Sequence, residues 1–256
     1  MTRIFDTYAH YYDLLYRDKD YAGEAAYVNS FIRKHSPKAS QILELGCGTG
    51  GHAVQFAQMG YAVHGVDLSS SMLTRANERK AALAPDISNR LSFDEGDART
   101  LRTGKTYDVV LALFHVMSYQ TSNSDLHAAF ETAFEHLAPG GVFLFDFWYG
   151  PAVLTEKPEV RLKRLEDEKI KVFRVAEPVL TASDSTVDVN YTMFVHDKKG
   201  GQIEQFSESH KMRYFFLSEM ENYLTGRFSH PGFFEWMTEH PLSTSTWSGF
   251  TCALRA

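Results

Sequence analysis

The sequence has little cysteine, no excess of basic charge and no long hydrophobic run. Its two cysteines, Cys47 and Cys252, do not suggest a disulfide scaffold. Lysine and arginine number 26 against 32 aspartates and glutamates, so the formal net charge is −6 and no basic stripe indicates a nucleic-acid partner. No apolar run approaches the length of a membrane span, and no signal peptide is recognisable. We therefore expect a cytoplasmic protein with neither a membrane nor a nucleic acid as partner.

Metal-binding spacing is also lacking. The 11 histidines form no H-E-x-x-H motif and no Cys/His metal pattern, so we expect no metal.

No segment is of low complexity, and a hydrophobic fraction of 44% is enough for a full core. A length of 256 residues predicts one large α/β domain, or one domain with an insertion.

The most informative stretch is a short apolar run, residues 42–45, that ends in three alternating glycines. Residues 52–59, which follow, are amphipathic. Strand, glycine turn and helix in this order open a nucleotide-binding α/β fold. Glycines suit the turn because the chain must bend sharply while its backbone approaches a ligand closely. The N-terminus of the following helix then directs free N–H groups at that ligand.

Two ligands compete for this turn. Gly46, Gly48 and Gly51 satisfy the dinucleotide pattern G-x-G-x-x-G. Gly46, Gly48 and Gly50 equally satisfy E/D-x-G-x-G-x-G, the pattern of enzymes that use S-adenosylmethionine (SAM). Glu44 favours the second, because an acid at this place crowds a pyrophosphate but suits the cationic methionine end of SAM.

Acidic residues end the next two predicted strands. Asp67 closes the strand 61–67, where a carboxylate can accept both ribose hydroxyls of an adenosine. Ser69 is the better cap for the helix that follows, which leaves Asp67 for a ligand. Asp97 ends the strand predicted within residues 91–98. An acid there accepts from the adenine amino group in SAM enzymes, with the next backbone N–H on the ring, and NAD enzymes do not usually carry it.

Residues that are candidates to contact the substrate follow the strongly apolar strand 107–114. His115 and Tyr119 stand at its carboxyl end, the edge at which open α/β sheets bind ligands. His115 is a candidate base or substrate contact, although a lone histidine is often only structural. Tyr12 and Tyr16 share one face of an N-terminal helix, where they either pack on the domain or form a lid over the substrate.

The second half of the chain changes character. Alternating apolar and polar residues predict antiparallel strands at 169–175, 187–195 and 202–216, in an insertion that walls the substrate site or forms a dimer contact. Ser218 and Glu221 fit a capping box that opens a helix. We expect three units: residues 1–150 form the lid and the cofactor-binding core, residues 151–216 form the insertion, and residues 217–256 complete the core sheet. Within the last unit, strands 233–237 and 248–254 should pair antiparallel.

These features together resemble a class I SAM-dependent methyltransferase over residues 41–147. The resemblance implies a doubly wound α/β fold around a mostly parallel, seven-stranded sheet. A second resemblance, to nucleotide-amino-sugar N-methyltransferases that make N,N-dimethylated sugars, spans nearly the whole chain. The segments that carry it are 12–16, 19–21, 114–119, the β insertion, 207–216 and 248–250.

The resemblance implies SAM as cofactor, S-adenosylhomocysteine as product, a nucleotide-linked amino sugar as substrate and a homodimer. It places Tyr16 near the sugar amine and Tyr119 where relatives carry a tyrosine or histidine. His115 departs from the relatives, which have a small residue there, so a different amino sugar or another small amine also fits. The predicted cofactor site comprises Glu44, Gly46, Cys47, Gly48, Gly50, Asp67, Leu68, Asp97, Ala98 and Phe114.

Three alternatives stay open at this point. An O-methyltransferase would use His115 as the base that a weakly nucleophilic hydroxyl requires. A binding protein would hold SAM without turnover, and an NAD oxidoreductase would use the same glycine turn. No set of metal-binding carboxylates is evident, which speaks against a metal-dependent methyltransferase.

Overall fold

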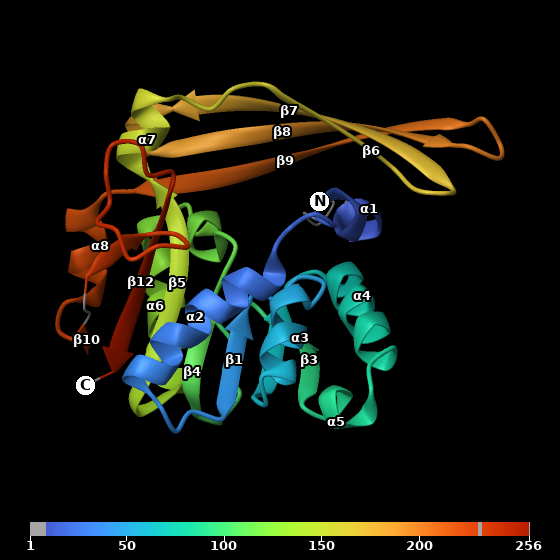
Figure 1. The fold of residues 1–256 in the computed structure, drawn as a ribbon. Helices are drawn as coiled ribbons and strands as arrows, with labels where there is room; N and C mark the ends of the chain where they lie inside the picture. The colour runs from blue at the N-terminus through green and yellow to red at the C-terminus, as the bar shows by residue number, and fades with distance from the viewer. Residues whose placement is uncertain (1–8, 230–231, 256) are drawn as a thin grey trace.

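Five parallel strands form the centre of the fold, in the order β3–β2–β1–β4–β5 (Figure 1). The computed structural model describes residues 9–229 and 232–255. Because β1 and β4 are flanked on both sides, their residues are almost wholly buried. The strands are β1 (Gln41–Leu45), β2 (Ala62–Asp67), β3 (Leu91–Glu95), β4 (Tyr107–Ala112) and β5 (Leu137–Tyr149).

Three further strands complete this sheet beyond β5. β12 (Ser248–Arg255) runs antiparallel to β5, and β10 (Phe228–Ser229) and β11 (Phe233–Glu235) both pair antiparallel with β12. The predicted antiparallel pairing of the two last segments is confirmed. The doubly wound, mostly parallel α/β fold expected from the sequence is therefore the observed one.

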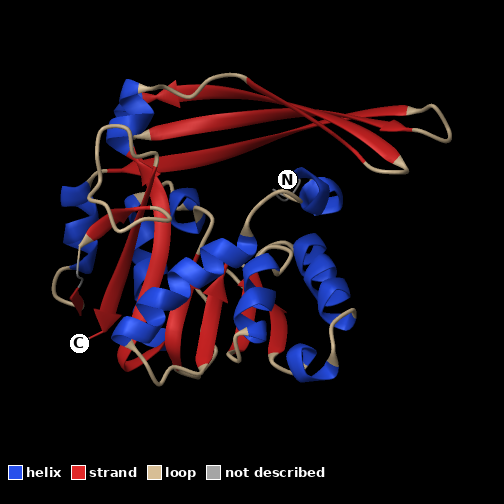
Figure 2. Cartoon of the chain, viewed as in Figure 1, coloured by secondary structure: helices blue, strands red, loops and turns tan. Residues whose placement is uncertain are grey.

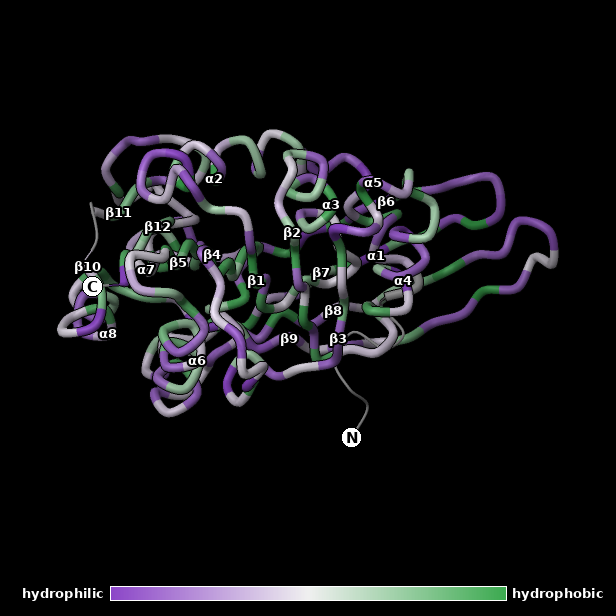
Figure 3. Tube along the Cα trace, turned by 90° about the horizontal axis from the view of Figure 1, so that it is seen from below, coloured by the Kyte–Doolittle hydropathy of each residue, from purple (hydrophilic) through white to green (hydrophobic). Residues whose placement is uncertain are grey.

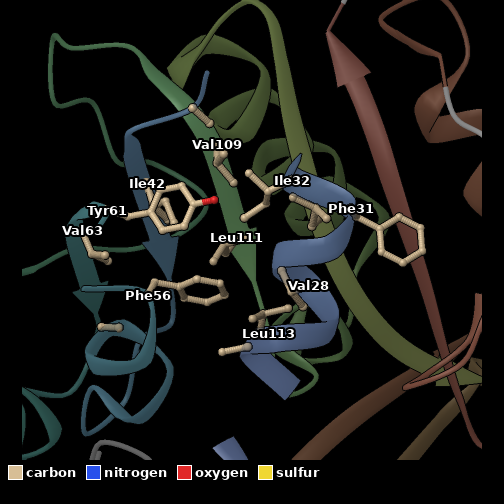
Figure 4. Close-up of a cluster of buried hydrophobic side chains, with 14 of the residues drawn as sticks. Val28, Phe31, Ile32, Ile42, Phe56, Tyr61, Val63, Val109, Leu111 and Leu113 are labelled. Carbon is tan, nitrogen blue, oxygen red and sulfur yellow. The ribbon is translucent and has the colours of Figure 1, made fainter. Parts of the chain in front are cut away.

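Helices cover both faces of the central sheet (Figure 2). On one face α2 inserts Val28 and Ile32 against Ile42 and Leu111 of the strands (Figure 4). On the other face α6 and α8 pack on the alternate residues of the same strands. The helices are α2 (Tyr21–His35), α3 (Gly51–Gln58), α4 (Ser70–Ala81), α5 (Pro85–Ser88), α6 (Asn123–His136) and α8 (Leu217–Leu224), with the 3-10 helix η1 (Val116–Tyr119).

Four antiparallel strands cross above the carboxyl ends of the parallel strands (Figure 1). They are joined to the core through a short parallel pairing of β9 with β5. Hydrophobic positions gather in the middle of the molecule, whereas the far hairpin ends of the insertion are hydrophilic (Figure 3). The segment comprises α7 (Gly150–Thr155), β6 (Arg161–Glu166), β7 (Ile170–Thr181), η2 (Ala182–Asp184), β8 (Thr186–Asp197) and β9 (Ile203–Phe215).

The N-terminal helix α1 (Ala9–Leu15) lies between the core and this insertion. Leu15 is fully buried in a cluster with Met72 of α4 and with Leu165 and Met193 of the insertion sheet. The aromatic N-terminal segment therefore packs as a cover over the site edge, and its part before residue 9 lies outside the described residues.

Two details differ from the sequence prediction. β6 was not predicted, because its residues are mostly exposed and only Leu165 is buried. The capping box at Ser218 is wrong: α8 already begins at Leu217, and Phe216 precedes it without a side-chain cap. The division into units at residues 150 and 216 stays a prediction. None of the helices in the described part of the chain has the length and apolar character needed to cross a bilayer.

Core burial gives a stability prediction. Leu111 of β4 is fully buried, so Leu111→Ala should lower the free energy of unfolding by about 2–5 kcal/mol through lost burial and the cavity left behind. Val179→Ala on β7 is the control, because Val179 is 55% exposed and its truncation should change stability by less than about 1 kcal/mol. Urea unfolding measures both, and equal losses would contradict the packing described.

Candidate active site

The glycine turn after β1 has the backbone that the sequence predicts. Gly46, Gly48 and Gly50 all have positive φ, between 54° and 76°, a region that side chains disfavour. A Cβ at Gly46 would lie 2.5 Å from a methyl of Val116, so this position has no room for one. A Cβ at Gly48 would meet no atom within 4 Å, so this glycine faces open space. The turn therefore offers bare backbone to a ligand.

Asp67 ties this turn to the end of β2. Its Oδ2 accepts from the Gly48 N–H at 2.8 Å, and its Oδ1 accepts from the Ser69 N–H at 2.9 Å. Burial raises the pKa of Asp67, and these backbone donors oppose that rise. Ser69 caps α4 through Met72, as predicted. Each carboxylate oxygen of Asp67 keeps a further lone pair for a ligand hydroxyl.

Glu44 lies behind the turn, with only 2% of its surface exposed. Its Oε1 is 3.9 Å from His52 Nδ1, and its Oε2 has no hydrogen-bond partner among the residues described. Burial, with the nearby charge of Asp67, raises the pKa of Glu44 to about 8. On its far side His52 Nε2 contacts Glu24 at 2.7 Å. A buried carboxyl with a free oxygen suits a cationic ligand group such as the ammonium of methionine.

Asp97 is more constrained than the sequence indicates. Its carboxylate forms a bidentate pair with the guanidinium of Arg99, with contacts of 2.6 Å and 2.9 Å, and also accepts from the Arg99 N–H. Burial alone would raise the pKa of Asp97, but the Arg99 contacts outweigh it and the pKa lies below its usual value. Arg99, which sequence reasoning missed, also contacts Asp125. The pair fixes Asp97 at the ligand edge.

The end of β4 is held in an unusual conformation. Phe114 and His115 both have positive φ, 65° and 67°, which costs a non-glycine residue about 1–3 kcal/mol. The His115 N–H donates to both oxygens of Asp146, and His115 Nδ1 lies 2.7 Å from Asp146 Oδ2. The two side-chain atoms are close, but they do not form a hydrogen bond, and His115 Nδ1 has no hydrogen-bond partner among the residues described. Asp146 is 1% exposed, so it holds His115 from the buried side.

Two tyrosines reach the site from different elements. The Tyr16 ring packs at a tilt against Tyr12 and edge-to-face against Phe114, with ring centroids 4.6 Å and 5.2 Å away. The Tyr119 hydroxyl, on η1, lies within hydrogen-bond distance of His210 Nδ1, at 2.8 Å. Burial raises the pKa of Tyr119 well above its ordinary value, so its hydroxyl is neutral and cannot serve alone as a base.

A cavity of about 750 Å³ joins these groups. The parallel strands form its floor, and the inner face of the insertion sheet forms its roof. All the predicted site residues except Glu44 and Gly50 line it. The lining residues that sequence reasoning missed include Arg99, Trp148, Arg161, Tyr191, His210 and Trp247.

The cavity walls carry no metal cluster. Among the residues described, no group of three or more His, Cys, Asp or Glu side chains is placed to hold a metal ion. Cys47 lines the cavity, but burial raises its pKa well above the ordinary thiol value, so the thiol stays neutral and unreactive.

Comparison with known proteins now decides the family. The family described as "Methyltransferase domain" matches residues 42–141. The chain is 31% identical to dTDP-3-amino-3,4,6-trideoxy-alpha-D-glucopyranose N,N-dimethyltransferase of Streptomyces venezuelae, over 84% of this chain and 86% of that protein. A dTDP-3-amino-3,6-dideoxy-alpha-D-glucopyranose N,N-dimethyltransferase of Streptomyces fradiae is 30% identical over 85% and 81%.

The chain belongs to the SAM-dependent methyltransferases. Solved structures agree with this methyltransferase fold. Streptomyces venezuelae DesVI superposes with a TM-score of 0.77 at 27% identity, over 97% of this chain and 98% of that one. A SAM-bound amino pentose methyltransferase from Micromonospora echinaspora superposes with a TM-score of 0.73 at 26% identity, over 100% and 99%. The NAD alternative is thereby wrong, and SAM is the cofactor of this methyltransferase.

The buried Glu44 gives a pH prediction. Folded Glu44 keeps its proton up to about pH 8, whereas an ordinary glutamic acid releases it near 4.5. Between these values the folded state binds the extra proton, so stability falls as pH rises, by up to about 1.4 kcal/mol per pH unit. Glu44→Gln should remove this slope in the ligand-free protein.

Urea unfolding between pH 5 and pH 8, the range set by the Glu44 pKa of about 8, measures the difference. Glu78→Gln is the control, because the Glu78 side chain is 62% exposed and should leave the slope unchanged. Parallel stability curves for wild type and Glu44→Gln would show that Glu44 is ionised in the folded state.

Proposed function

We propose that this methyltransferase transfers a methyl group from SAM to the amino group of a nucleotide-linked amino sugar. The observation that supports the proposal is a cavity of about 750 Å³ lined both by most of the residues predicted for SAM and by Tyr16, His115 and Tyr119, with residues of the insertion sheet on its opposite side. The names of the similar proteins, which act on dTDP-linked amino sugars, support this substrate class.

The predicted cofactor residues have distinct roles in this proposal. Gly46 and Gly48 let the backbone approach SAM, and Asp67 accepts from the ribose hydroxyls. The free oxygen of Glu44 receives the cationic methionine end. Asp97 and the Ala98 N–H receive the adenine edge. Cys47, Leu68 and Phe114 supply the remaining floor contacts in the proposal, and Gly50 provides the positive φ with which the turn enters α3.

The chemistry asked of the protein is modest. Bound SAM supplies a methyl group on a sulfonium, which carries its own good leaving group. The chain must hold a neutral amine in line with that methyl, exclude water and accept one proton. Tyr16 and Tyr119 orient the amine, and the roof with α1 excludes water.

A second candidate function has a specific observation in its favour. His115 lines the cavity, and its Nδ1 lies 2.7 Å from the buried carboxylate of Asp146, so the imidazole is held where a general base would face a bound acceptor. A sugar hydroxyl is a weak nucleophile and needs a strong general base, whereas an amine needs only positioning and an acceptor for its proton. O-methylation of a small-molecule hydroxyl is therefore the alternative, with His115 as the base.

We further propose a homodimer and a cytoplasmic location, both of which the sequence resemblance implies. Among the described residues, β6 pairs on one side only, and Val160 and Leu162 beside it are 67% and 53% exposed. An unpaired strand edge is a surface that a second copy can cover, and Val160 and Leu162 offer it apolar contacts. Light scattering after gel filtration measures the mass, and a monomer at micromolar concentration would contradict the dimer.

The ribose role of Asp67 predicts a binding defect. Asp67→Ala should weaken S-adenosylhomocysteine binding by about 10- to 100-fold, because hydrogen bonds to a charged group contribute about 1.5–3 kcal/mol. Calorimetry measures the affinity, and Asp67→Asn separates the loss of charge from the loss of the turn contacts. Asp86→Ala, at an exposed position in α5, is the control. Unchanged affinity in Asp67→Ala would refute the ribose role.

An acceptor screen by mass spectrometry tests the proposed reaction. The protein is incubated with SAM and matched pairs of dTDP-linked sugars that differ only in carrying an amino or a hydroxyl group. We expect one or two added methyl groups on the amino sugars and none on their hydroxyl partners. Methylation of hydroxyl sugars alone that is abolished by His115→Ala would establish the alternative. Binding of S-adenosylhomocysteine without methylation of any acceptor would favour a binding protein.

A further inference from the structure

A chain of three polar side chains leads from the cavity into the insertion sheet. Tyr119 and His210 both line the cavity, and their Oη and Nδ1 atoms are 2.8 Å apart. Behind them, His210 Nε2 lies 3.3 Å from Glu208 Oε2. His210 and Glu208 are two residues apart on β9 and therefore face the same side of the sheet.

The contacts select one tautomer of the imidazole. A neutral histidine has one N–H and one bare nitrogen. Glu208 is an acceptor, so Nε2 carries the hydrogen and donates to it, and the bare Nδ1 accepts from the Tyr119 hydroxyl. The three side chains are thereby arranged to move a proton from the cavity toward Glu208.

A second group of a tyrosine, a histidine and an acid occurs elsewhere in the protein, and comparison with it shows that burial at the cavity distinguishes the first. His64 contacts the Tyr107 hydroxyl at 2.7 Å and Asp94 at 2.9 Å, the same order of groups. That trio is absent from the cavity wall, and its Asp94 side chain is 71% exposed. The side chains of His210 and Glu208, in contrast, are 4% and 11% exposed, so their interactions are only weakly screened by water.

We propose that Tyr119, His210 and Glu208 form the proton acceptor for the substrate amine. The proposal rests on the proposed amine methylation. A substrate ammonium breaks one N–H bond and gives that proton to the Tyr119 oxygen, while the Tyr119 O–H proton passes to His210 Nδ1. The freed lone pair then forms the C–N bond as the S–CH₃ bond breaks. A second methylation requires the same step again, after His210 has released its proton to solvent.

Other titratable groups face this chain from the neighbouring elements. Tyr191 of β8 meets the His210 ring at 5.0 Å between ring centroids, and Arg174 of β7 lies over Tyr191 at 4.9 Å. Tyr16 and Asp67 act on Tyr119 electrostatically from the α1 side and from the floor. Arg174 and Asp67 carry opposite charges, and Glu208 is the acid in contact with the imidazole, with its Oε2 3.3 Å from His210 Nε2.

The proposal predicts a change in pH dependence. Tyr119→Phe and His210→Gln should lower kcat by about 100-fold at pH 7, the usual contribution of a positioned acid or base. At high pH the amine loses its proton to solvent, so the rates of the variants should approach that of wild type. The fraction of dimethylated product should fall more than the monomethylated fraction, since each methyl needs a proton acceptor. The acceptor used is dTDP-3-amino-3,6-dideoxyglucose, measured by mass spectrometry.

Three further variants sharpen the test. Tyr119→His keeps a proton-accepting group and should retain most of the rate at pH 7, and Glu208→Gln should shift the pH profile less than His210→Gln. His64→Gln removes the matched histidine outside the cavity and should leave the profile unchanged. Calorimetry with S-adenosylhomocysteine checks that each variant is folded. If His210→Gln does not fold, Glu208→Gln replaces it in the test.

Each result decides the matter. A loss of rate by the same factor at every pH, or no loss, would overturn the proton-accepting chain and leave Tyr119 as a positioning residue, while amine methylation by wild type stands. A wild-type protein that methylates no amine would overturn the proposed function and this inference together.

Discussion

The hydrogen bond from Gly48 N–H to Asp67 Oδ2 ties the end of β1 to the end of β2, and the site is built around it. It holds the glycine turn open, so that bare backbone faces the cavity. It also brings Asp67 close to the buried Glu44, whose pKa rises to about 8 partly for that reason. The ligand-free floor therefore stores unfavourable burial of acidic groups, and a ligand with a cationic end relieves it.

A second constraint is that the floor alone cannot enclose a substrate. The roof comes from strands whose inner faces carry Tyr191 and His210, joined to the core through β9 and β5. The helix α1 wedges between the roof and α4 through Leu15. In the proposed function, SAM is therefore recognised by the parallel core, and the methyl acceptor is recognised where the insertion meets that core. This division explains why a common methyltransferase core can serve many acceptors.

Sequence reasoning could predict the floor and the antiparallel strands of the insertion, but not which insertion residues face the cavity. Gly46, Gly48 and Asp67 sit at strand ends, and the carboxyl ends of parallel strands meet at one edge, so local patterns place them together. Tyr119 contacts His210, 91 residues along the chain, and His115 contacts Asp146, 31 residues along the chain. Only the folded topology brings such distant residues together. β6 escaped prediction because an exposed edge strand lacks the apolar alternation of a half-buried one. The capping box at Ser218 was wrong because the chain enters α8 from β9 already at Leu217.

The central claim is that floor and roof form one site that binds two ligands. Hydrogen exchange of the protein with S-adenosylhomocysteine, alone and then with a dTDP-linked amino sugar, tests it directly. The account predicts that the first ligand protects the turn after β1 and the ends of β2 and β4. The second should add protection in α1, η1 and the cavity-facing parts of β8 and β9. Protection by the amino sugar confined to a surface away from the insertion, or none beyond that of S-adenosylhomocysteine, would contradict it.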